Sequence, residues 1–134
     1  GHVLPESIAR DARSAENLFP EDPKILHFMQ PHAPFFGYDF GGKKESFDQD
    51  AVKEKSYVQA ELGWISENEI RKAYRENLEF VMEEVKELIK DLDGRTVITA
   101  DHGELLGENG LYGHPRGSNA KVLREVPWDV VKEE

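Results

Sequence analysis

The sequence predicts an α/β fold in which a mostly parallel sheet is flanked by helices. Two short apolar runs, residues 24–29 and 95–100, are typical of buried strands, and the second is rich in β-branched side chains. A long helical pattern over residues 66–92 lies between them. A strand, a long crossover with a helix and a second strand make a βαβ-like unit, whose two strands run parallel.

Residues 1–23 are predicted to form a separate N-terminal segment of helical or irregular structure. Within it, residues 7–19 place apolar side chains at helical spacing, and Pro20 and Pro23 end the pattern. Residues 24–131 then form the predicted α/β domain.

Residues 31–63 are aromatic, glycine-bearing and charged, without clear periodicity. An irregular stretch of this length inside a domain is usually a functional loop or lid. A mobile, solvated excursion is the alternative, and the sequence favours neither. Lys43 and Lys44 in this stretch, and Arg116 further on, either attract an anionic substrate or are simply solvated.

The helix over residues 66–92 carries the clearest local signals. Ser66 and Glu69 form a capping box, in which each side chain bonds the backbone N–H of the other. Apolar residues then recur every three or four positions, so one stripe faces the core. Gly94 suits the left-handed position that ends a helix.

The composition excludes several classes of partner. A net charge of −10 argues against nucleic acid and anionic membranes, but not against an anionic small molecule at a bound metal. The chain has no cysteine, which excludes disulfides and zinc–thiolate sites. No apolar run approaches the about 20 residues of a membrane span, and no secretory signal is visible. The 33% of charged residues, of both signs, indicates a cytoplasmic protein, although a start at Gly1 leaves room for an upstream targeting segment.

The chemistry is concentrated in residues 96–114, where the predicted strand stops at Asp101-His102-Gly103 and a glycine-rich loop follows. Carboxylate oxygens and imidazole nitrogens are donors for divalent cations, and ligands bind beyond the carboxyl ends of parallel strands. Asp101 and His102 are therefore candidate metal ligands. The alternative is that Asp101 caps the next turn and that His102 is an ordinary surface residue.

These residues resemble the C-terminal metal-binding signature of the alkaline phosphatase superfamily, in its sulfatase-like branch. The similar segments are residues 100–104 (ADHGE) and 107–110 (GENG) in the signature, residues 25–34 in a strand that ends in Pro-His-x-Pro, residues 74–92 in the preceding helix, and residues 126–128 in the following strand. The resemblance covers roughly residues 24–131 and implies that superfamily's α/β fold, as a partial domain.

The resemblance implies a divalent metal cation, whether Ca, Mn, Zn or Mg, bound by Asp101 and His102. It also implies that His32 contacts an ester group. His114 stands where many sulfatases have lysine, whereas phosphoethanolamine transferases of the superfamily have histidine there. Histidine can donate to an oxyanion, act as general acid or ligate a second metal. His114 and His32 are thus the candidate catalytic residues, and the substrate is an anionic small-molecule sulfate or phosphate ester.

Three other residues have plainer expected roles. His27, inside the first predicted strand, is expected to be a core histidine. Glu104 is expected to cap the turn after Asp101, with support of the metal from outside its ligand shell as the alternative. Met82 stands where the sulfatase helix commonly has aspartate, which argues against the ordinary arylsulfatase type.

The family's N-terminal strand with acidic metal ligands, and the nucleophile after it, have no counterpart in residues 1–23. The chain is therefore expected to be the C-terminal part of a longer metal-dependent ester hydrolase, inactive alone, whose partner is the missing N-terminal part of the same chain. Three alternatives stay open: a phosphotransferase of the same superfamily, a degenerate domain that binds a metal or anion without catalysis, and a structural interaction domain.

Overall fold

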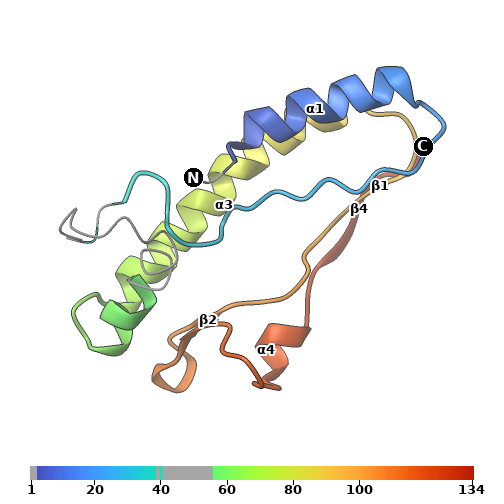
Figure 1. The fold of residues 1–134 in the computed structure, drawn as a ribbon. Helices are drawn as coiled ribbons and strands as arrows, with labels where there is room; N and C mark the ends of the chain where they lie inside the picture. The colour runs from blue at the N-terminus through green and yellow to red at the C-terminus, as the bar shows by residue number, and fades with distance from the viewer. Residues whose placement is uncertain (1–2, 39, 41–55) are drawn as a thin grey trace.

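The computed structural model describes residues 3–38, 40 and 56–134 (Figure 1). The elements in chain order are α1 (Pro5–Leu18), α3 (Glu67–Ile89), β1 (Thr96–Thr99), β2 (Leu105–Leu106), the 3-10 turn η1 (Glu108–Gly110), β3 (Tyr112–Gly113), α4 (Lys121–Arg124) and β4 (Trp128–Lys132). Residues 56–61 are also helical. Within these described ranges, none of the helices has the length and apolar character that crossing a membrane requires.

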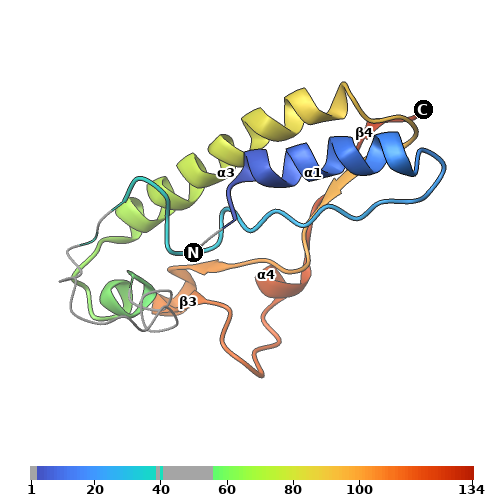
Figure 2. The same cartoon turned by 45° about the horizontal axis from the view of Figure 1, so that its top comes forward.

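The two long helices, α1 and α3, lie side by side, and β1, β4 and α4 lie to one side of them (Figures 1 and 2). Their shared core consists of Ala9, Ala12, Leu88 and Leu92. The small alanine side chains of α1 allow the helices to approach closely, and α1 is confirmed close to its predicted bounds. The predicted N-terminal segment therefore packs directly on the predicted domain, and the boundary between them at residue 24 stays a prediction.

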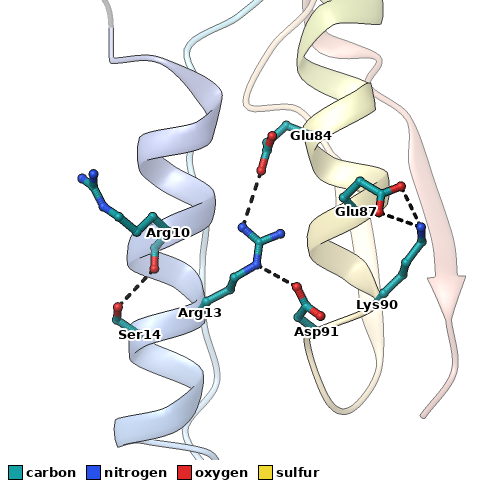
Figure 3. Close-up of polar contacts among 7 residues, drawn as sticks. All are labelled: Arg10, Arg13, Ser14, Glu84, Glu87, Lys90 and Asp91. Carbon is teal, nitrogen blue, oxygen red and sulfur yellow. Dashed lines mark hydrogen bonds and ion pairs between the residues drawn. The ribbon is translucent and has the colours of Figure 1, made fainter.

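An ion-pair bridge joins the same two helices at their surface (Figure 3). Arg13 Nε lies 2.7 Å from Asp91 Oδ2, and Arg13 Nη1 lies 3.6 Å from Glu84 Oε1. The hydrogen bond to Asp91 raises the pKa of Arg13. Because these side chains are substantially exposed, the bridge adds little, and the apolar core holds the helices together.

α3 begins where the capping box predicts. Ser66 Oγ accepts a hydrogen bond from Glu69 N at 3.2 Å, and Glu69 Oε2 accepts one from Ser66 N at 2.8 Å. The bond from the Ser66 backbone, followed by the one from its side chain, lowers the pKa of the Glu69 carboxyl. Beyond the helix, Gly94 has φ 82°, as the left-handed position requires. The predicted helix and its stop are confirmed.

The strands form antiparallel pairs, where the sequence predicts a mostly parallel sheet. β1 pairs with β4, so that Thr99 lies opposite Trp128, and β2 pairs with β3, so that Leu105 lies opposite Gly113. After β1 the chain makes the β2–β3 hairpin and α4, then returns beside β1 in the opposite direction. The described residues therefore combine helices and strands, but they contain no parallel pair.

Residues 24–29, the other predicted strand, are extended without a strand partner in the described part of the chain. Leu26 and Phe28 pack against the α1–α3 core, while Ile25 is 98% exposed. Side-chain exposure alternates along this segment as it would in a strand, but within the described residues the segment joins no hydrogen-bonded sheet. His27 is exposed, so its prediction as a core histidine is wrong.

A second core lies between the N-terminal half of α3 and the loops around it. It consists of Ala33, Phe35, Tyr57, Ala60, Ile65, Ile70 and Ala73. Three partly buried side chains pack against this core: Tyr74, Leu106 and Tyr112. Residues 41–55 of the predicted loop or lid, with Lys43 and Lys44, lie outside the described residues.

Asn77, on α3, holds the start of the irregular stretch over residues 31–63 by hydrogen bonds to Phe36. Its side chain is buried, its Oδ1 accepts from Phe36 N at 2.7 Å, and its Nδ2 donates to Phe36 O at 3.2 Å and to Ala73 O at 3.0 Å. One amide thus satisfies both backbone groups of Phe36. This clamp lies only four residues after His32 and fixes the path of that segment.

Asn77→Ala should lower the free energy of unfolding by about 1–3 kcal/mol, because the buried amide's three hydrogen bonds to the backbone of Phe36 and Ala73 are lost. Urea denaturation followed by circular dichroism measures the change. Glu79→Ala, at an exposed position of the same helix, is the control and should stay within about 0.5 kcal/mol of wild type. Equal losses of stability in the two variants would show that the hydrogen bonds of Asn77 do not stabilise the fold.

Candidate functional site

The turn after β1 is held against the backbone of α4. Gly103 N donates to Leu123 O at 3.0 Å. A Cβ at Gly103 would lie 1.8 Å from Val122 O, well inside any possible contact. Just before the turn, Thr99 Oγ1 donates to Pro127 O at 2.7 Å. Only glycine allows this approach at position 103, which fixes Asp101 and His102 at the end of β1.

Asp101 and His102 present two donors on one side of this turn. His102 Nδ1 lies 2.7 Å from Gly103 O, and because a carbonyl only accepts, Nδ1 carries the hydrogen. His102 Nε2 is then the nitrogen with a lone pair, and it lies 3.8 Å from Asp101 Oδ2. One divalent cation, with bonds of roughly 2.0–2.6 Å, can contact two donors at that separation.

The β2–β3 hairpin brings a second acidic residue to a second histidine. Leu105 lies opposite Gly113, so the next facing pair is Glu104 and His114. Glu104 Oε1 lies 2.6 Å from His114 Nδ1, and the side chain of Glu104 is only 5% exposed, against 42% for His114. The prediction that Glu104 caps the turn after Asp101 is therefore wrong, because its carboxylate turns inward to His114.

Three histidines that are far apart in the sequence converge at this place. The ring centroid of His114 lies 4.4 Å from that of His102 and 5.6 Å from that of His32. His32 Nδ1 lies 2.5 Å from Ala33 O, so this ring, too, is anchored through Nδ1. The four residues singled out from the sequence thus form one cluster, with Asp101 at its exposed edge. Their chemical roles stay predictions.

Two tyrosines line the buried side of the cluster. Burial, followed by the charge of Glu104, raises the pKa of Tyr57. The Tyr57 hydroxyl is buried and has no hydrogen-bond partner among the described residues. Burial also raises the pKa of Tyr74. The Tyr57 ring lies against Gly113, where an added Cβ would be 3.4 Å from it. Both phenols are therefore neutral and form a wall rather than a base.

The donor set in the described ranges is partial. No group of three or more histidine, cysteine, aspartate and glutamate residues is arranged there to hold a metal ion. Asp101 and His102 suit a divalent cation by donor type and spacing, but they supply only two donors.

Sequence reasoning missed the contact between Glu104 and His114 and the wall made by Tyr57. The hairpin register pairs the first two residues, and two-residue strands are too short to predict from alternation. Glycines 107, 110 and 113, which shape the hairpin, were the available signal.

Comparison with known proteins gives one family. Residues 24–124, about three quarters of the chain, match the Sulfatase family. No curated protein matches the chain, and no solved structure matches it.

Gly103→Ala should destabilise the protein by about 1–3 kcal/mol or more, because the new methyl group must displace the Val122 carbonyl. Gly110→Ala is the matched variant, since a Cβ there meets nothing within 4 Å but the residue has φ 74°. Its cost should be about 1–2 kcal/mol, from backbone conformation alone. Thermal unfolding of both variants checks whether Gly103→Ala is the more destabilising of the two. A Gly103→Ala protein as stable as wild type would contradict the close approach.

Proposed function

The chain belongs to the sulfatase family, and from this premise we propose that it contributes half of the active site of a metal-dependent hydrolase of sulfate or phosphate esters. The family supports a sulfatase-like hydrolase. The observation that carries the finer proposal is the convergence of His32, His102 and His114, with ring centroids 4.4 and 5.6 Å apart, at the Asp-His-Gly turn.

Asp101 and His102 are the proposed metal ligands, through Asp101 Oδ2 and His102 Nε2. The carboxylate is already oriented, because its Oδ1 accepts from His102 N at 3.0 Å. A bound Ca, Mn, Zn or Mg ion would neutralise charge that develops on the ester oxygens and lower the pKa of a nucleophile. The donor types do not select among these cations.

His114 and His32 are the proposed catalytic residues. With Nδ1 of His114 bonded to Glu104, its Nε2 is the nitrogen that can take up a proton and then donate it to an ester oxygen. The ring is 42% exposed, so a small anionic ester can reach it. His32 is held from both sides by Pro31 and Pro34, and its ring meets that of His114 edge to face.

We infer that the rest of the active site, including the nucleophile, comes from a preceding part of the same parent protein. Apolar surface supports this: Ile25 is 98% exposed and Trp128, on β4, is 69% exposed. A two-stranded sheet is marginal without further strands or a covering layer. A larger sheet would cover these side chains and complete the ligand shell around Asp101 and His102.

Asp101→Asn and His102→Ala should each weaken binding of Ca, Mn or Zn by at least about tenfold, because each removes one of two first ligands. Isothermal titration calorimetry on the protein extended by its upstream coding region measures this. Asp129→Asn, an exposed carboxylate on β4, is the control and should bind like wild type. Equal affinity in the Asp101 and Asp129 variants would exclude the proposed ligands.

Hydrolysis is tested on the protein extended by its upstream coding region, with an aryl sulfate and an aryl phosphate as substrates. His114→Ala should lower kcat by about 10²–10⁴-fold, the range for a positioned proton donor. Specific metal binding without hydrolysis would make this a non-catalytic metal-binding member. A protein that neither binds a metal nor hydrolyses either ester would instead be an interaction domain.

A further inference from the structure

Glu104 is a buried carboxylate whose hydrogen-bond partner within the described residues is the side chain of His114. Its side chain is 5% exposed, and Oε1 lies 2.6 Å from His114 Nδ1. Burying a carboxylate is costly unless it is paired and hydrogen-bonded. A glutamate in this position therefore needs a reason beyond packing, since an apolar side chain would fill the same space at lower cost.

The contact is built on rigid structure. Glu104 and His114 flank the paired residues of β2 and β3, and Gly113 lies beneath the Tyr57 ring. Tyr57 is 8% exposed, and the negative charge of Glu104 helps raise its pKa, so the two side chains interact electrostatically. A hydrogen bond in such a poorly hydrated place is stronger and better oriented than one in water.

His114 is anchored differently from His102. His102 directs Nδ1 to the backbone carbonyl of the next residue, a local contact. His114 is instead held by a charged side chain ten residues away along the chain. A carboxylate partner fixes both the orientation of an imidazole and which nitrogen carries the hydrogen.

We propose that Glu104 is the positioning residue for His114. Its carboxylate accepts from His114 Nδ1–H, holds the ring in that tautomer, and leaves Nε2 as the nitrogen that takes up a proton and donates it to an ester oxygen. The role of Nε2 toward an ester oxygen rests on the proposed function. The contact between Glu104 and His114 and the resulting tautomer do not, because they follow from the hairpin and the buried carboxylate alone.

Nitrogen NMR on the chain tests the contact without any activity. Long-range ¹H–¹⁵N correlation, with the His114 signals assigned by their loss in His114→Ala, should show Nδ1–H as the dominant neutral tautomer. In Glu104→Gln, which keeps the size of the side chain, the two ¹⁵N shifts of His114 should move toward each other. A wild-type His114 that is mainly the Nε2–H tautomer would overturn the proposal whether or not any variant folds.

Glu108→Leu is the matched control for a merely structural role. Glu108 lies in the same hairpin, where its Oε2 accepts from Leu106 N at 2.6 Å and its Oε1 lies 3.3 Å from Arg71, without contact to His114. It should destabilise the hairpin but leave the tautomer of His114 unchanged. If Glu108→Leu shifts the His114 nitrogens as much as Glu104→Gln does, Glu104 has no positioning role.

Kinetics on the extended protein separate this proposal from the proposed function. Glu104→Gln should lower kcat by about 10–100-fold with little change in KM, the size of effect found for residues that orient a functional side chain. An unchanged kcat in an active enzyme would overturn the positioning role. An extended wild-type protein that hydrolyses neither ester would instead count against the proposed function, and the tautomer would still be decided by NMR.

Discussion

The close backbone approach at Gly103 is the constraint on which the site depends. Its N–H bonds Leu123 O at 3.0 Å, and its missing side chain makes room for Val122 O. This contact ties the end of β1 to α4, and the bond from Thr99 to Pro127 ties the same strand to the start of β4. Since β1 and β4 then pair, the turn that carries Asp101 and His102 cannot move independently of the strands.

A second, independent set of contacts brings His32 to the same place. Its segment is held by Asn77, which bonds both backbone groups of Phe36, and by Phe35, whose ring meets Tyr57 and Tyr74 edge to face at 5.9 and 6.5 Å. Tyr57 also covers Gly113 of the hairpin. One aromatic cluster therefore sets the distance between the loop with His32 and the hairpin with His114.

The elements that the sequence predicts well are those whose signals are local. The capping box at Ser66 and the stop at Gly94 are written within a few residues of the helix ends, and both are confirmed. Strand pairing depends on residues far apart, and the predicted parallel pairing is not confirmed, because the pairs within the described residues are antiparallel. Glu104 was misassigned for the same reason, because its contact with His114 exists only in the hairpin register.

The net charge of −10 does not prevent an anionic ester from binding at this cluster. At physiological ionic strength, charges farther than about 8 Å away are largely screened, so nearby groups decide. Among the described residues, two carboxylates of the cluster are engaged in hydrogen bonds: Asp101 Oδ1 accepts from His102 N, and Glu104 accepts from His114. Under the proposed function, a cation shared by Asp101 and His102 would add positive charge there, so that metal binding and anion binding would reinforce each other.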